Sequence, residues 1–192
     1  MICFSPSSQR REKVAGFHCA SARFLCIASC GFDSDANRIA NEAKMVKGPL
    51  VYAYAALRAL AQWKPATFTL RWEDGEKTIT GYSVAAANSN AYGGGMFVAP
   101  DAELDDGMLD VVSTAKVSKG AFLRGLPDVF KGTHVNRPEV DVFRCRELEI
   151  SADRDFALFA DGEHITDLPA KIRLLPKALE LIAPAAGPAQ PL

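Results

Sequence analysis

The strongest constraint on the fold is a change to two-residue alternation at residue 66. The segments ATFTLRWE (66–73) and KTITGYSVAAAN (77–88) alternate between apolar and polar side chains, which is the period of a half-buried β-strand. Between them stands Asp74-Gly75-Glu76. An Asp-Gly pair flanked by alternating residues is the strongest short-range indication of a β-hairpin. An antiparallel meander is therefore expected to begin here.

Further short apolar segments follow this hairpin. The candidate strands are residues 95–100, 108–115, 139–151, 156–160, 170–175 and 179–183. One helix is expected among them, between Ser118 and Phe130. Many short strands joined by Asp-Gly turns predict an α+β fold that is mainly β, in the form of a β-sandwich with two or three helices.

The segment before the meander predicts one strand and two helices. Residues 23–30 alternate weakly, as a strand would, and in the following GFDSDANRIANEAKM either Asp33 or Ser34 is expected to cap a helix. Pro49 suits the first position of a second helix. The apolar stripe of this helix is Leu50, Tyr54, Leu57 and Ala61.

Length and composition indicate one globular domain without a strong overall charge. The chain has 192 residues, of which 48% are hydrophobic, and 22 basic against 23 acidic side chains give a net charge of −1. This balance argues against nucleic acid as a partner. Five cysteines without a C-x-x-C pair favour reduced thiols and a cytoplasmic location. Residues 1–22 remain unassigned, 23–184 carry the predicted elements, and 185–192 are expected to form a flexible tail.

Residues 91–112, AYGGGMFVAPDAELDDGMLDVV, are the most unusual stretch because three glycines precede a group of carboxylates. These carboxylates are Asp101, Glu103, Asp105, Asp106 and Asp110. Mg²⁺ prefers oxygen ligands, so one or two of them could hold it, although a solvated acidic turn has the same composition. A calcium EF-hand is excluded because the twelfth position of such a loop would be Val112.

The three glycines are candidates for binding the phosphates of a cofactor. Gly93, Gly94 and Gly95 would let backbone amides approach a phosphate closely. No Lys-Ser or Lys-Thr follows them, so the segment is not a Walker loop. A bulge or a close strand crossing is the alternative interpretation.

A second candidate site is the turn in FALFADGEHI, where Asp161 and Glu163 flank Gly162. A carboxylate at such a turn can act as a general base when a substrate hydroxyl comes within hydrogen-bonding distance. A plain structural turn is equally consistent with these residues. Asp74-Gly75-Glu76 is the same tripeptide, so residue chemistry alone does not choose between the two turns.

Several motifs, taken in order, resemble the diacylglycerol kinase family that includes YegS-like and sphingosine-kinase-like lipid kinases. The motifs are GFDSDANRIAN, KGPLVYAYAALRAL, NSNAYGGGMFVAPDAELDDGMLDVV, FADGE and KALELIAP. The resemblance covers residues 23–184 and corresponds to the C-terminal lobe of these enzymes. The Gly-Gly-Asp-Gly-Thr loop of their nucleotide-binding lobe does not occur in this sequence.

The resemblance implies phosphoryl transfer from ATP to a lipid alcohol, with Mg²⁺ held at the turn formed by Asp105, Asp106 and Gly107. Asp106 would be the main ligand, and the main-chain carbonyl of Met108 or Leu109 a second. It also implies that Asp161 is the general base and Glu163 a supporting carboxylate. Asp161 is chosen over Asp74 by the order of the family's motifs.

The resemblance also sets expectations about partners. Without a nucleotide-binding lobe the 192 residues are expected to be inactive, with an exposed apolar surface that binds the missing lobe or a second copy. Peripheral contact with the inner membrane surface is a further expectation. Two alternatives are a non-catalytic lipid- or metal-binding β-sandwich module and a fragment of an NAD-kinase-like enzyme. Against the latter, the G-G-G-x-x-x-A-P and D-D-G-x-L-D series favours the lipid kinases.

Overall fold

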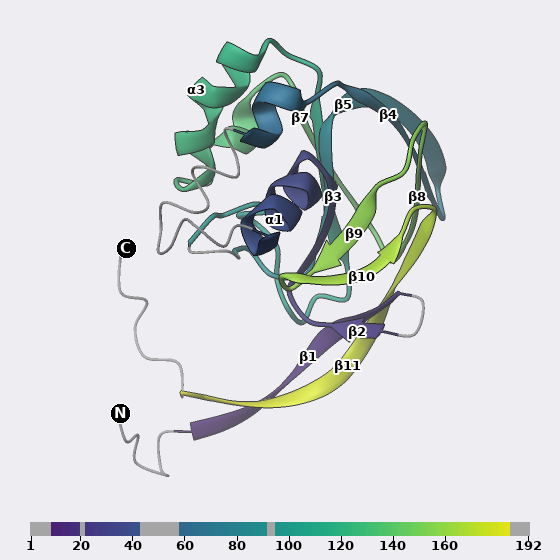
Figure 1. Ribbon diagram of the computed structural model, residues 1–192. Coiled ribbons are helices and arrows are strands. Elements are labelled where there is room, and N and C mark those ends of the chain that lie inside the picture. Colours follow the sequence, from purple (N-terminus) through teal and green to yellow (C-terminus); the bar gives the residue numbers. More distant parts are fainter. Residues whose placement is uncertain (1–8, 20–21, 43–57, 92–94, 185–192) are drawn as a thin grey trace.

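The computed structural model describes residues 9–19, 22–42, 58–91 and 95–184, and in these ranges the fold is mainly β (Figure 1). The strands are β1 (Gln9–Cys19), β2 (Ala22–Phe24), β3 (Ile27–Gly31), β4 (Ala66–Trp72), β5 (Gly75–Ala87), β6 (Leu109–Ala115), β7 (Val140–Cys145), β8 (Glu147–Ala152), β9 (Ala157–Ala160), β10 (Glu163–Asp167) and β11 (Ala170–Pro184). The helices are α1 (Phe32–Glu42) and α3 (Lys119–Val129), with a 3₁₀ turn η2 (His134–Asn136).

All eleven strands belong to one antiparallel hydrogen-bonded sheet. Its order is β10-β9-β3-β5-β4-β8-β11-β1-β2, with β6 paired to β5 and β7 paired to β6. The sheet curves around a core of buried apolar side chains, which gives the predicted mainly-β sandwich (Figure 1). Among the described residues, no helix has the length and apolar character needed to cross a membrane.

The predicted hairpin at residues 66–88 is confirmed as β4 and β5. Trp72 pairs with Gly75, so the two loop residues are Glu73 and Asp74, and Gly75 already belongs to the strand. The Glu73 carboxylate accepts hydrogen bonds from the backbone N–H groups of Arg146 at 2.7 Å and Glu147 at 3.2 Å. These bonds attach the hairpin to the corner between β7 and β8.

Four of the strands predicted after the first hairpin differ in the structure. Residues 95–100 form turns with a single bridge at Met96. They do not form a strand because their N–H groups donate to different segments: Phe97 N to Val129 O, and Ala99 N to Asn90 O. Residues 139–151 divide at Arg146, since β7 pairs with β6 whereas β8 pairs with β4 and β11. The strands predicted at 170–175 and 179–183 are one strand, β11.

Strand β1 lies in the segment for which the sequence predicted no element. It pairs antiparallel with β11 from Gln9 opposite Pro184 to Cys19 opposite Ile172. The register shifts between Val14 and Gly16, which breaks the two-residue alternation that would have revealed a strand. The two strands form a long ribbon at the opposite end of the molecule from α3 (Figure 1). Residues 9–19 are therefore part of the same sheet.

The helices agree with the sequence in part. Helix α1 begins at Phe32, so Asp33 and Ser34 lie in its first turn instead of preceding it. The Ser34 hydroxyl donates to Gly31 O at 2.8 Å and accepts from Gly31 N at 3.1 Å. Helix α3 matches its prediction, with the Ser118 hydroxyl accepting from Ala121 N at 3.2 Å. Of the helix predicted from Pro49, residues 58–62 are helical. Residues 49–57 and the predicted tail lie outside the described ranges.

An aromatic cluster attaches α3 to the sheet. The ring of Phe122, on α3, stacks on Tyr82 of β5 with 4.1 Å between centroids and meets Phe32 edge-on at 4.9 Å. The Tyr82 hydroxyl, on an otherwise fully buried side chain, donates to the carbonyl of Val117 at 3.0 Å. This contact satisfies the one polar atom of the ring and fixes the start of α3.

Two glycines allow a test of how closely β5 and β6 are packed. A Cβ at Gly81 would overlap the carbonyl of Thr114 and the main chain of Ala115, whereas one at Gly120 on α3 would meet nothing within 4 Å. We expect Gly81→Ala to lower the free energy of unfolding by roughly 1–3 kcal/mol. Gly120→Ala should raise it by about 0.5 kcal/mol through helix propensity. Urea denaturation measures both, and equal stability of the two variants would contradict the observed strand approach.

Candidate functional site

The turn that carries Asp161 joins β9 to β10. Ala160 pairs with Glu163, so Asp161 and Gly162 are its two central residues, with φ values of 50° and 90°. Positive φ at both positions is the pattern of a type I′ turn, for which Asp-Gly is a preferred sequence. In the other Asp-Gly-Glu segment the central residues are Glu73 and Asp74. The two identical tripeptides therefore occupy different positions in their hairpins.

The Asp161 carboxylate accepts hydrogen bonds from three consecutive backbone N–H groups between β2 and β3. Leu25 N lies 2.7 Å from Oδ2, Ile27 N lies 3.1 Å from Oδ1, and Cys26 N lies between the two oxygens at 3.0 and 3.3 Å. The backbone N–H of Asp161 donates to Ile27 O at 3.1 Å. An ionised carboxylate has about four acceptor positions. Three donors leave room for one more, and we call this arrangement the Asp161 clasp.

Asn88, which follows β5, holds the connection between β2 and β3, to which the Asp161 carboxylate also binds. Its side-chain amide donates to Leu25 O and to Ala15 O in β1, both at 3.0 Å. Its backbone N–H and that of Ser89 donate to Cys26 O at 2.9 and 3.4 Å. Asn88 is buried, and its Oδ1 has no hydrogen-bond partner among the described residues. Sequence reasoning did not single out Asn88; a polar residue ending an apolar strand before the glycines was the only indication.

Asp161 and the acidic loop, which carries Asp101, Glu103, Asp105, Asp106 and Asp110, lie at the same end of the neighbouring strands β9, β3, β5 and β6, and we call this end of the strands the site edge of the sheet. Asp161 adjoins Ile27, Ile27 pairs with Ala87, and Ala87 pairs with Asp110. Three strand intervals of about 4.8 Å put the backbones of Asp161 and Asp110 roughly 14 Å apart. Two segments that are distant in the sequence are thus neighbours on this edge, with Asn88 between them.

The acidic loop is organised by Arg144 of β7. The Asp106 carboxylate accepts from Met108 N at 2.9 Å and forms an ion pair with the Arg144 guanidinium. Asp110 is 4% exposed, with Oδ1 3.5 Å from Arg144 Nε and a buried Oδ2 that has no partner among the described residues. Burial raises the pKa of Asp110, and the nearby carboxylates of Asp101 and Glu103 raise it further. The Arg144 guanidinium therefore offsets part of the excess negative charge of this loop.

The donor chemistry of this loop, which offers carboxylate and main-chain carbonyl oxygens, suits a hydrated Mg²⁺. Asp105 is exposed, and Asp106 already has Arg144 and Met108 N as partners. Leu109 is the first residue of β6, opposite Cys145. No group of three potential His, Cys, Asp or Glu ligands occurs in the part of the chain that the structure describes. The unpartnered oxygen of Asp110 nevertheless indicates that the loop can accommodate more positive charge.

The other predicted site residues are less constrained. Gly95 has a φ of 93°, and apart from its chain neighbours none of the described residues has an atom within 4 Å of the position of a Cβ, so its Cα is open to approach. Gly93 and Gly94 lie outside the described residues. Glu163 is exposed at the start of β10 and forms no hydrogen bond with Asp161.

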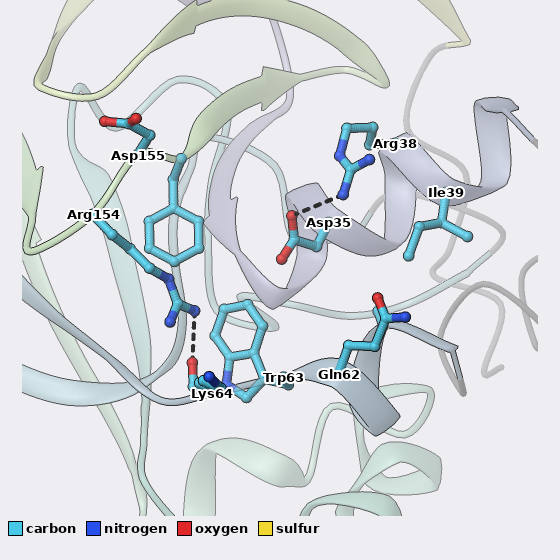
Figure 2. A pocket seen from close by; sticks show the side chains of 10 residues that line it. Asp35, Arg38, Ile39, Gln62, Trp63, Lys64, Arg154 and Asp155 are labelled. Carbon is cyan, nitrogen blue, oxygen red and sulfur yellow. Dashed lines mark hydrogen bonds and ion pairs between the residues drawn. The ribbon is translucent and has the colours of Figure 1, made fainter.

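A groove lies at the other end of β9. A hollow of about 250 Å³ is lined by residues that include Trp63, Lys64 and Arg154 (Figure 2). The Arg154 guanidinium lies 5.0 Å from the Trp63 ring and donates to Lys64 O at 2.6 Å. An adjoining hollow of about 600 Å³ reaches Ala157, the first residue of β9. Ala157 precedes Asp161 by four residues, or roughly 13 Å along a strand, so the groove and the clasp are separate.

Comparison with known proteins gives the family: the model described as the YegS C-terminal NAD kinase beta sandwich-like domain matches residues 26–183. The chain belongs to this family, as its motifs predicted.

Individual relatives agree with this assignment. A diacylglycerol kinase from Mycobacterium tuberculosis is 33% identical over 165 residues, which cover 85% of this chain and 53% of that protein. A diacylglycerol kinase from Bacillus subtilis is 24% identical over 76% of this chain and 48% of its own length. The crystal structure of a diacylglycerol kinase from Bacillus anthracis superposes with a TM-score of 0.62 at 13% identity, covering 93% of this chain and 55% of that one. The chain spans about half the length of these proteins.

The Asp161 clasp predicts a stability difference between the two Asp-Gly-Glu turns. Asp161→Asn replaces one acceptor oxygen by an NH₂ group that opposes the backbone donors of residues 25–27. We expect it to lower the free energy of unfolding by about 2 kcal/mol. Asp74→Asn should change it by less than about 0.5 kcal/mol. Chemical denaturation gives both values, and an unchanged stability of Asp161→Asn would show that the clasp contributes nothing.

Asp33, in the first turn of α1, predicts a pH dependence. Burial raises its pKa from 3.8 to about 6, so between about pH 4 and pH 6 the folded state holds a proton that the unfolded state has released. Stability should therefore fall as the pH rises through this window. Asp33→Asn should be more stable than the parent at pH 7, by on the order of 1–3 kcal/mol, and the difference should shrink towards pH 4.

Urea denaturation at several pH values tests this expectation. Asp35→Asn is the control, because it loses only an exposed ion pair with Arg38 and should cost under about 1 kcal/mol. A difference between Asp33→Asn and the parent that stays constant from pH 4 to pH 7 would contradict the raised pKa.

Proposed function

We propose that these residues form the C-terminal lobe of a lipid kinase that transfers the γ-phosphoryl group of ATP to the hydroxyl of a lipid alcohol. The observation that carries the proposal is the site edge shared by Asp161 and the acidic loop. Phosphoryl transfer depends on positioning and charge neutralisation, so a proton acceptor and a cation site are needed in one region. The names of the relatives, diacylglycerol kinases, support the same reaction class.

In the proposed step Asp161 accepts the proton of the lipid hydroxyl. The hydroxyl oxygen forms a bond to the γ-phosphorus, the bond from that phosphorus to the β–γ bridging oxygen breaks, and ADP leaves. The clasp keeps the carboxylate in place, and its remaining acceptor position is open to the hydroxyl because Asp161 is exposed. Glu163 lies one residue beyond the turn and adds negative charge there. Gly95, open at its Cα, is the described glycine that a phosphate could approach.

Mg²⁺ would be held at the acidic loop, with Asp106 as the main carboxylate ligand. When bound, Mg²⁺ supplies positive charge that neutralises phosphate oxygens. Arg144 occupies the same carboxylate, so it competes with the cation for Asp106 and keeps the loop folded without it. The buried, unpartnered oxygen of Asp110 lies beside this pair and favours additional positive charge. One or two carboxylates leave most of an octahedral shell to water, so binding should be weak.

A non-catalytic lipid- or metal-binding module is the second candidate, and the clasp itself favours it. Both oxygens of Asp161 already accept backbone hydrogen bonds, which is sufficient reason for an aspartate at this turn without any catalysis. The NAD-kinase-like alternative shares the β-sandwich, but all three kinases described above as relatives are named diacylglycerol kinases.

Activity measurements on a reconstituted enzyme distinguish these candidates. The 192 residues alone should not turn over ATP and a lipid panel with Mg²⁺, and a nucleotide-binding lobe supplied as a fusion or separate chain should restore activity. In that enzyme, Asp161→Asn should lower kcat by roughly 10² to 10⁴-fold while ATP and lipid binding persist.

Asn88→Ala is the matched control, since it removes two hydrogen bonds to Leu25 and Ala15 beside the clasp and leaves the proposed base unchanged. It should lose stability as Asp161→Asn does but keep kcat within about threefold when assayed below its unfolding temperature. Equal kcat losses in Asn88→Ala and Asp161→Asn would assign Asp161 a structural role and support the binding module.

A further inference from the structure

Helix α3 exposes apolar side chains that the fold does not use. None of its residues is buried, although Leu123 and the adjoining Phe130 are large and apolar, with 39% and 53% of their surfaces exposed. The helix contacts the sheet through Phe122, which directly precedes Leu123 and therefore lies about 100° around the helix from it. A helix in such a position could carry polar residues outward without cost to the core, so its outward apolar residues need another explanation.

The exposed residues of α3 form one face, which we call the α3 face. Leu123, Pro127 and Phe130 are spaced at i, i+4 and i+7 and all are exposed. Lys119 precedes Leu123 by one turn, Arg124 directly follows Leu123, and Lys131 lies two residues beyond the end of the helix; these three are exposed as well. The basic side chains therefore border an apolar centre on the same side of the helix.

Among the described residues, no ion pair with a carboxylate is formed by Lys119, Arg124 or Lys131. The one acidic residue of α3, Asp128, is directed to Arg137, with which it forms an ion pair at 2.9 Å. Lys119 and Arg124 donate to backbone carbonyls, of Ala61 and Gly120, which leaves their positive charge uncompensated. The whole chain has a net charge of −1, so this is a local concentration of positive charge.

We propose that the α3 face binds the surface of an anionic lipid bilayer. A helix with apolar residues on one side and Lys or Arg beside them lies in the plane of the interface, with its apolar side chains in the headgroup boundary. Leu123 and Phe130 would enter that boundary while Lys119, Arg124 and Lys131 contact anionic headgroups.

Charge complementarity favours a bilayer over a protein partner. Lysine is depleted from the central contacts of protein interfaces, whereas here two lysines border the apolar centre. The α3 face is also the outer side of a helix and not a groove, so it suits a flat, fluid surface. The proposal concerns binding alone and holds whether or not the lobe takes part in catalysis.

Vesicle cosedimentation of the 192-residue chain tests the proposal. We expect binding to vesicles of phosphatidylglycerol and phosphatidylcholine in equal parts, weaker binding in 0.5 M salt, and little binding to phosphatidylcholine alone. Leu123→Glu/Phe130→Glu should lower the partition coefficient for anionic vesicles at least about tenfold. Val142→Glu is the matched control, because Val142 is 43% exposed on β7, and it should bind as the parent does.

The same variants provide the opposing outcomes. Absence of binding to anionic vesicles, or equal binding of parent and Leu123→Glu/Phe130→Glu, would overturn the proposal. A parent chain that sediments as a dimer and becomes a monomer in the double variant, without vesicle binding in either, would instead identify the α3 face as an interface between copies. Vesicle binding requires neither ATP nor a nucleotide-binding lobe, so failure of the proposed kinase activity would leave the result unaffected.

Discussion

The contact between the Asp161 carboxylate and the backbone of residues 25–27 organises the site edge of the sheet. Leu25 and Cys26 connect β2 to β3, Ile27 is the first residue of β3, and the N–H groups of all three donate to the carboxylate. Asn88 completes the arrangement by donating to the carbonyls of Leu25 and of Ala15 in β1. Backbone groups left without partners would each cost about 1–3 kcal/mol. The clasp therefore joins β1, β3, β5 and the β9–β10 hairpin at one point.

This arrangement gives a single side chain two possible roles. A carboxylate held by three N–H groups is rigid, which is what a catalytic group requires, and the same bonds would be needed if the turn had only to be stable. The acidic loop shows a comparable duality, because Arg144 both neutralises Asp106 and occupies the position where a cation would bind. At this edge, interactions that stabilise the fold and interactions that chemistry would need involve the same atoms.

Helix α3 is connected to this edge through the segment that follows the glycines. Phe97 N donates to Val129 O at the end of α3 at 2.9 Å, and the buried His134 contacts Val98 O at 3.1 Å. The same segment continues through Ala99 to the acidic residues. A surface bound by α3 would therefore be linked by a short, hydrogen-bonded path to the loop proposed to hold Mg²⁺. The groove beside Arg154 lies at the other end of β9 and has no such link.

The sequence by itself determined the elements whose pattern is local. Two-residue alternation and turn chemistry identified the β4–β5 hairpin, β6 and β9. The helix predicted between Ser118 and Phe130 matches α3, and the order of motifs identified the family. Only the tertiary structure decided the rest. It recruited β1 through pairing with β11, far along the chain, and divided residues 139–151 between different partners. It also gave Asp161, but not Asp74, a place in the clasp, and it paired Arg144 with Asp106. The physical reason is that register and pairing depend on distant strands, so identical tripeptides acquire different neighbours when the sheet closes.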